Sequence, residues 1–218
     1  MIENKQWSVK VIKDNILYPF LIVDNWYTEE EEKSIWQELN YYLSVGKKNL
    51  KRAENTVVAT KNDIPLSNAF RIYLENFYTK EGFENSTIFK CTYKQKTKQF
   101  LDHIKNCVPY GRTFKDSNGV STLISYYEEN DYYDTHYDNF QWTNCIWMCK
   151  EPKKFNGGDF ELPEIKTKIL LKNNRAIFFP SCFEHKSNVI KFNEKINDIG
   201  FGKFTITHFY YSFPSGQL

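Results

Sequence analysis

After Gly111 the sequence changes character, because helical spacing of apolar residues gives way to short β-rich runs separated by turn residues. The turns contain Asn, Asp and Gly, as in Asn156-Gly157-Gly158 and Lys172-Asn173-Asn174, and these residues accept the backbone angles that tight turns require. The β-rich runs cover residues 120–127, 142–148, 159–162, 168–171, 176–179 and 203–211. Many short strands at regular spacing predict a β-sandwich or barrel.

The first half of the chain predicts mainly helices, after two early strands at residues 9–12 and 20–23. Thr28 and Glu31 form a capping box for a first helix, which carries Ile35, Trp36, Leu39, Tyr42 and Leu43 at helical spacing. Ser67 is expected to cap a second helix with Phe70, Tyr73 and Phe77. A third helix is expected over about residues 94–106, with Phe100, Leu101 and Ile104 inward. These helices would cover one face of the β-structure.

The length of 218 residues suits one domain over 1–218, with helical and strand support in 1–119 and the β core in 120–212. The formal net charge of +2 gives no strong field toward nucleic acid or an anionic membrane. No apolar stretch approaches the length of a membrane span. We therefore expect a soluble, cytoplasmic protein that binds neither nucleic acid nor membrane.

The five cysteines, Cys91, Cys107, Cys145, Cys149 and Cys182, are odd in number and lack tight spacing. This pattern disfavours a disulfide framework and favours buried, reduced thiols. A zinc site at Cys145 and Cys149 is the alternative, but no CxxC pair accompanies them.

The candidate chemistry lies at His136, Asp138 and His185. In an extended segment, residues two apart point to the same side, so His136 and Asp138 are able to face one metal ion. His185 follows another strand-like run, and two histidines with one carboxylate form the facial triad of Fe(II) oxygen chemistry. The alternative for each histidine is a hydrogen-bonded structural role. That role is expected for His208, whereas His103 is expected at the surface.

Four motifs together resemble the prolyl 4-hydroxylase-like branch of the Fe(II)- and 2-oxoglutarate-dependent oxygenases. Residues 127–139 resemble its tyrosine-to-HxD segment, and Gly157-Gly158-Asp159-Phe160 resembles its double-glycine turn. Phe178-Phe179-Pro180-Ser181 before His185 resembles its distal-histidine strand, and Gly202-Lys203-Phe204-Thr205-Ile206-Thr207 resembles its last core strand. Residues 21–26 also match the usual family opening, so the resemblance covers most of the chain.

The resemblance implies a mostly β fold with N-terminal helices, a double-stranded β-helix (jelly roll) flanked by helices. It implies that His136, Asp138 and His185 bind Fe(II), and that 2-oxoglutarate and O2 are consumed while the substrate is hydroxylated and succinate and CO2 are released. Ascorbate is a candidate addition. The carboxylate at Asp138 argues for hydroxylation over halogenation.

The resemblance also gives Lys203 a role, since the distal carboxylate of 2-oxoglutarate needs a fixed cation. Lys195 stands nearer the usual family spacing, but it lies in an exposed-looking segment, and we attribute the extra length to a hairpin insertion. Thr207 shares a face with Lys203 and Thr205 and is expected to donate to the same carboxylate. A tyrosine that some relatives use would fall near Met148, so Tyr127, or alternatively Tyr126, is expected to replace its hydroxyl.

Several other features have competing interpretations. Lys90, Lys94, Lys96 and Lys98 are expected to form a solvated helix face, with phosphate binding as the alternative. Of Tyr126, Tyr132 and Tyr133, one is expected to line a substrate pocket. Trp142 is expected either at the mouth of the barrel or in the core.

The expected substrate is a prolyl residue in a peptide or protein. The alternative is a free amino acid or another small molecule, and a remoter alternative is a non-catalytic jelly-roll binding module. Nucleic-acid demethylation is disfavoured, because the relatives that perform it carry two arginines in the last strand, whereas this chain has no arginine after Arg175.

Overall fold

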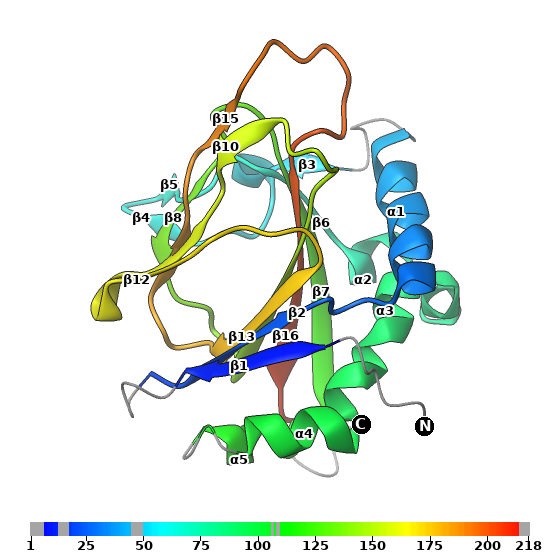
Figure 1. Cartoon of the computed structure of the whole chain (residues 1–218), viewed down its shortest axis with the longest axis vertical. Coiled ribbons are helices and arrows are strands. Elements are labelled where there is room, and N and C mark those ends of the chain that lie inside the picture. Colours follow the sequence, from blue (N-terminus) through cyan, green and yellow to red (C-terminus); the bar gives the residue numbers. More distant parts are fainter. Residues whose placement is uncertain (1–6, 13–17, 45–49, 106, 108–109, 214–218) are drawn as a thin grey trace.

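The computed structural model describes residues 7–12, 18–44, 50–105, 107 and 110–213. Its largest element is an eight-stranded antiparallel sheet that runs across the molecule (Figure 1). The strands lie in the order β1 (Ser8–Ile12), β2 (Phe20–Asp24), β13 (Arg175–Pro180), β9 (Trp142–Met148), β16 (Lys203–Tyr211), β7 (Gly119–Tyr127), β6 (Phe70–Tyr73) and β3 (Lys51–Arg52).

A four-stranded sheet packs against one face of this large sheet. Its order is β12 (Thr167–Ile169), β11 (Phe160–Leu162), β14 (His185–Ser187) and β8 (Tyr133–His136). Two-stranded ribbons pair β10 (Phe155–Gly157) with β15 (Ile190–Phe192) and β4 (Thr60–Lys61) with β5 (Ile64–Pro65). Buried side chains of both larger sheets, including Trp147 and Phe160, form one apolar cluster between them. The predicted jelly-roll fold with flanking helices is confirmed.

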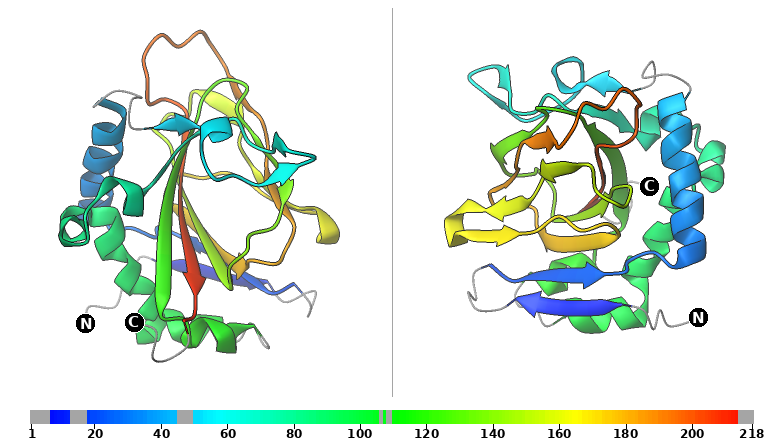
Figure 2. Two further views of the ribbon diagram at one scale, coloured as in Figure 1. Left: turned by 180° about the vertical axis from the view of Figure 1, so that it is seen from behind. Right: turned by 45° about the horizontal axis from the view of Figure 1, so that its top comes forward.

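The helices gather on the opposite face and at one end of the large sheet (Figures 1 and 2). They are α1 (Glu29–Ser44), α2 (Leu74–Phe77), α3 (Thr87–Lys90), α4 (Lys98–Ile104) and α5 (Gly111–Lys115), with 3-10 turns at Ala53–Asn55, Glu81–Asn85, Cys91–Lys96 and Pro163–Ile165. No helix in these described segments has the length and apolar character needed to cross a bilayer.

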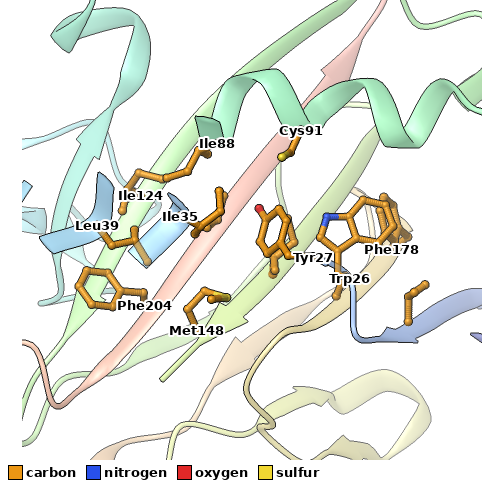
Figure 3. Close-up of a cluster of buried hydrophobic side chains, with 14 of the residues drawn as sticks. Trp26, Tyr27, Ile35, Leu39, Ile88, Cys91, Ile124, Met148, Phe178 and Phe204 are labelled. Atoms are coloured by element: carbon orange, nitrogen blue, oxygen red, sulfur yellow. The ribbon is translucent and has the colours of Figure 1, made fainter. Parts of the chain in front are cut away.

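The larger apolar core lies between these helices and the outer face of the large sheet. Figure 3 shows Ile35 and Leu39 of α1 beside Ile124 of β7 and Phe204 of β16. The predicted capping box at the start of α1 is present, because Thr28 Oγ1 accepts from Glu31 N at 3.3 Å and Glu31 Oε2 accepts from Thr28 N at 2.8 Å. Side chains on the outer face of the large sheet pack in this core. Side chains on its inner face point toward the small sheet, where they are able to line a pocket.

The predicted second helix is wrong over most of its length. Residues from Phe70 to Tyr73 form strand β6, which pairs with β7, and only the short helix α2 follows. Ser67 caps no helix; its hydroxyl donates to Tyr132 O at 3.0 Å. The spacing of Phe70, Tyr73 and Phe77 fits a helix, but the hydrogen-bond ladder with β7 and the β-favouring residue types decide the conformation.

The predicted third helix is interrupted, and its lysines are not all solvated. Thr97 accepts from Phe100 N and caps α4 after the preceding 3-10 turn. Lys94 is buried, pairs with Glu31 and donates to Trp26 O at 2.9 Å. Lys96 is exposed, as expected, although its Nζ also donates to Ser117 Oγ at 2.8 Å. The solvated-face interpretation therefore fails for Lys94, whose side chain extends into the protein to reach its acceptors.

The six predicted β runs of the second half all contain strands, with ends that differ by at most two residues. The predicted hairpin insertion before Lys203 is wrong, because residues 193–202 form an irregular loop, the orange arch of Figure 1. That segment, which includes Asn193, Glu194, Asn197 and Asp198, lacks the alternation that a paired strand requires. Lys195 is exposed on this loop, as expected.

Candidate active site

A pocket with a cavity volume of about 50 Å³ opens between the two larger sheets. Its walls come from the inner face of β7 and β16, from β9, and from the small sheet. The lining residues are Arg71, Leu123, Ser125, Tyr127, Tyr133, His136, Asp138, Cys145, Trp147, Phe160, His185, Lys186, Ser187, Lys203, Thr205, Thr207 and Phe209. All six residues that the sequence predicted for the site, His136, Asp138, His185, Lys203, Thr207 and Tyr127, are among them.

His136, Asp138 and His185 converge in this pocket. His136 ends β8 and His185 begins β14, and the two residues lie opposite each other in the small sheet. Nε2 of His136 is 3.7 Å from Asp138 Oδ1, and Nε2 of His185 is 3.6 Å from Asp138 Oδ2. Within the described ranges, no other group of three or more histidine, cysteine or acidic side chains gathers its ligand atoms in this way. The three side chains are close enough to bind one metal ion.

Each imidazole is oriented by a backbone carbonyl two residues earlier. Nδ1 of His136 lies 2.7 Å from Asp134 O, and Nδ1 of His185 lies 2.9 Å from Phe183 O. Because a carbonyl oxygen only accepts, Nδ1 carries the proton in both rings and Nε2 keeps its lone pair for a metal. Burial, assisted by His185, also lowers the pKa of His136 to about 2, so this ring is neutral at pH 7.

Asp138 is held by a side chain of β9 and by the turn that follows β13. Its Oδ2 accepts from Thr143 Oγ1 at 2.7 Å, and that hydroxyl lies 2.8 Å from Ser181 Oγ. Asp138 N donates to Ser181 O at 2.9 Å, so side chain and backbone are both held. Such bonds orient a ligand before the metal arrives.

Aromatic rings hold the two histidines from the side. Tyr133 stacks on His136 with ring centroids 3.6 Å apart, and Phe160 stacks on His185 at 5.4 Å. Phe179 meets His185 edge-on at 4.8 Å. The imidazoles therefore have little rotational freedom.

Lys203 is a buried cation in the same pocket. Its Nζ donates to Gly158 O at 2.8 Å and to Ser187 Oγ at 2.6 Å. Gly158 has a φ of +73°, and a Cβ there would lie 3.3 Å from Lys203 Cδ and 2.6 Å from Ile190 Cδ1. The double glycine of the sequence thus makes room for the lysine. Within the described ranges no carboxylate pairs with Lys203, and burial lowers its pKa to about 7.

The other residues considered for cosubstrate binding lie on β7 and β16, and they differ in which face of the large sheet they occupy. Tyr127 faces the pocket, with Lys203 Nζ 5.0 Å from its ring centroid. Tyr126 faces the helices, where its hydroxyl accepts from Gly200 N at 2.7 Å. Thr207 Oγ1 lies 3.8 Å from Cys145 Sγ. Ser187 is a hydroxyl that the sequence did not indicate, and it contacts Lys203 directly.

Trp142 and His208 both belong to the large core. Trp142 is fully buried and its indole donates to Tyr110 O at 3.1 Å, so the possibility that it borders the mouth is excluded. His208 is fully buried beside Thr122 Oγ1, 3.0 Å from its Nδ1, and its structural role is confirmed. His103 is half-buried on α4. All five cysteines are free, and Cys145 and Cys149 belong to no cluster of metal ligands within the described ranges.

The sequence reasoning missed Arg71, which lines the pocket from β6. Its assignment to a helix concealed the strand alternation that turns Arg71 and Tyr73 to the same side. Among the three tyrosines considered for the pocket, Tyr133 lines it, whereas Tyr126 packs in the core and Tyr132 is partly exposed.

No protein-family model matches this sequence, and no curated protein matches it. Solved structures do resemble it. A prolyl-4-hydroxylase from Pseudomonas putida aligns over 95% of this chain and 93% of its own, with a TM-score of 0.55 and 10% identity. A viral collagen prolyl hydroxylase from Paramecium Bursaria Chlorella virus-1, solved as a 2-oxoglutarate complex, aligns over 89% and 96%, with a TM-score of 0.54 and 14% identity.

At such low identity, structural similarity establishes the fold and leaves substrate open. The chain has the prolyl 4-hydroxylase-like fold of the Fe(II)- and 2-oxoglutarate-dependent oxygenases.

Proposed function

We propose that this protein is an Fe(II)- and 2-oxoglutarate-dependent oxygenase that hydroxylates its substrate and releases succinate and CO2. The observation that carries the proposal is the convergence of His136, Asp138 and His185 in one pocket with a buried lysine. Two imidazoles and one carboxylate form a donor set that would suit Fe(II). When bound, the iron and 2-oxoglutarate supply the oxidation of an unactivated C–H bond by O2, and ascorbate is an optional addition to the assay.

The residues of the chain have separate tasks in this proposal. His136, Asp138 and His185 hold the metal, and Thr143 keeps the carboxylate of Asp138 in place. Lys203 binds the distal carboxylate of 2-oxoglutarate, while Tyr127 and Thr207 are proposed as further contacts to it. Trp147 and Phe160 form an apolar wall that excludes water from the reacting centre.

We further propose that the substrate is a prolyl residue of a peptide or protein. The structures that this chain resembles are named prolyl hydroxylases, and Tyr133 offers an aromatic surface beside the metal site. Proline-bearing segments present a preformed shape to aromatic side chains. The cytoplasmic location expected from the sequence stays a prediction.

The substrate proposal predicts a gain of one oxygen on proline. Peptides with varied proline contexts are incubated with the protein, Fe(II), 2-oxoglutarate and ascorbate, and analysed by mass spectrometry. We expect a mass gain of about 16 Da that is absent with Asp138→Ala, because the iron is then not held. Succinate formation stimulated by a free amino acid, with every peptide unmodified, would instead assign small-molecule hydroxylation.

The buried lysine predicts a pH dependence of cosubstrate binding. Burial lowers the pKa of Lys203 to about 7, whereas a carboxylate binds the protonated form. The protonated fraction, and therefore the affinity for 2-oxoglutarate, should fall about tenfold for each pH unit above that pKa. Anaerobic titration of 2-oxoglutarate into the Fe(II) protein at neutral and alkaline pH measures how this affinity depends on pH.

Lys203→Arg is the matched control for this titration, because a guanidinium keeps its charge throughout the range. Its affinity should change little with pH. An equally flat profile in the unmodified chain would contradict the lowered pKa of Lys203, and the effect of Lys203→Ala on affinity would then decide its role.

A further inference from the structure

Arg71 is a second buried cation in the metal pocket. It is only 3% exposed, although it stands on β6, the last but one strand of the large sheet. In register it lies beside Ser125 of β7, and Ser125 lies beside Thr205 of β16. These three residues form one row across the inner face, and all three line the pocket that holds the triad.

The guanidinium of Arg71 has incomplete partners. Nη1 donates to Val57 O at 3.1 Å, and the group lies 5.5 Å from the ring centroid of Tyr133. Its buried Nε has no hydrogen-bond partner among the described residues. Arg52 and Arg175, by contrast, each reach a carboxylate at 2.6 Å, on Asp131 and Asp24. A buried charge without a counter-ion is costly, so a buried arginine that has no ion pair with any described acidic side chain points to an anion supplied by a ligand.

A second unpartnered group lies on the same row. Thr205 Oγ1 is buried and has no hydrogen-bond partner in the described part of the chain. Arg71 and Thr205 flank Ser125, so a ligand placed against this row meets two unused polar groups. A carboxylate suits them, because a guanidinium presents parallel N–H donors to its two oxygens and a hydroxyl adds another donor.

The cosubstrate in the proposed function does not account for Arg71. Lys203 pairs in register with Tyr127 rather than Ser125, and its Nζ is bound to Gly158 and Ser187 on the side of the small sheet. In the proposed function, Lys203 alone would bind the distal carboxylate of 2-oxoglutarate, and the metal site would hold the rest of the molecule. Arg71 stands on the other side, where it also lines an open groove with Lys51, Val57 and Tyr73. Arg71 therefore borders both the metal pocket and this groove.

We infer that Arg71 binds a carboxylate of the primary substrate and thereby positions the C–H bond to be hydroxylated. The inference rests on the proposed function and narrows its substrate class to carboxylate-bearing molecules. A free amino acid, the C-terminus of a peptide and an acidic side chain next to the hydroxylated residue all provide this group.

The test compares acids with their amides on the protein loaded with Fe(II) and 2-oxoglutarate under anaerobic conditions. The probe pairs are L-proline and L-prolinamide, a peptide ending in free or amidated proline, and a Glu-Pro peptide with its Gln-Pro counterpart. Dissociation constants are measured by calorimetry. At least one acid should bind about tenfold or more tightly than its amide, and the pair that shows this difference identifies the source of the carboxylate.

Arg71→Gln should abolish the preference for the acid, Arg71→Lys should retain part of it, and the dissociation constant for 2-oxoglutarate should stay within about threefold in both variants. Lys51→Gln is the matched control, because Lys51 pairs with Arg71 in register, lines the same groove and is exposed. Its acid preference should be unchanged. Thermal unfolding and retained 2-oxoglutarate binding show that each variant is folded.

Two results would overturn the inference. One is that no acid binds more tightly than its amide to the unmodified chain. The other is that Arg71→Gln weakens 2-oxoglutarate instead of the probes, which would make Arg71 a cosubstrate residue. Failure of the proposed function appears separately, as absence of 2-oxoglutarate binding to the unmodified Fe(II) protein.

Discussion

Replacing any one of His136, Asp138 and His185 by alanine is expected to lower Fe(II)-dependent succinate formation by more than about a hundredfold, to background. Each side chain supplies one of three ligand atoms that lie within 4.8 Å of one another. Loss even of a group that only orients a ligand costs tenfold to about a hundredfold in metal proteins, and loss of the ligand itself should cost more.

The fold should survive these substitutions, because the large core between the helices and the outer face of the sheet contains none of the three residues. Circular dichroism and anaerobic Fe(II) titration separate loss of metal from loss of structure. His103→Ala, a half-buried histidine on α4, is the matched control and should retain activity. Unchanged Fe(II) affinity in any one triad variant would remove that residue from the site.

Lys203→Ala is expected to weaken 2-oxoglutarate binding by roughly 10- to 150-fold, which corresponds to a charge-assisted hydrogen bond of about 1.5–3 kcal/mol. Lys203 is the buried lysine of the metal pocket, and its Nζ already lies between two acceptors that orient it. The dissociation constant for 2-oxoglutarate, measured anaerobically on the Fe(II) protein, tests this expectation.

Lys195→Ala is the matched comparison, because it removes the same charge from the exposed loop 193–202. Its affinity for 2-oxoglutarate should stay within about twofold of the unmodified chain, since exposed charges are screened. If only Lys195→Ala weakens binding, the cosubstrate lies elsewhere in the pocket and the role given to Lys203 is wrong.

The site residues that could be predicted are those whose positions follow from the spacing of residues within a single strand. His136 and Asp138 are two residues apart in an extended segment. Lys203, Thr205 and Thr207 occupy every second position of β16, and all three line the pocket. Strand alternation alone places such residues on one face. The fold followed in the same way from runs of β-favouring residues between turns.

The parts that could not be predicted depend on contacts between distant segments. Arg71 lines the pocket because β6 pairs with β7. This pairing makes residues 70–73 a strand, although the spacing of their apolar residues also fits a helix. The neighbouring lysines predict a solvated position for Lys94, yet Lys94 is buried and pairs with Glu31, which lies far away in the sequence. The three-residue strands β10, β14 and β15 are too short to show a period, and pairing partners far along the chain define them.

The pairing of His185 with His136 across β14 and β8 gives a bound ion a role in folding as well as in chemistry. An ion that holds both side chains is a cross-link between strands far apart in the sequence, and it fixes their register next to the irregularity between His185 and Ser187. A slip of one residue would turn His185 to the other face of the sheet, so a mispaired chain loses the ion. Metal at about 100 times its dissociation constant favours the correctly paired state by about 2.7 kcal/mol. A bound ion would therefore favour the native alignment of the small sheet, and a chelator should loosen β8 and β14 before it loosens the helix-covered large sheet.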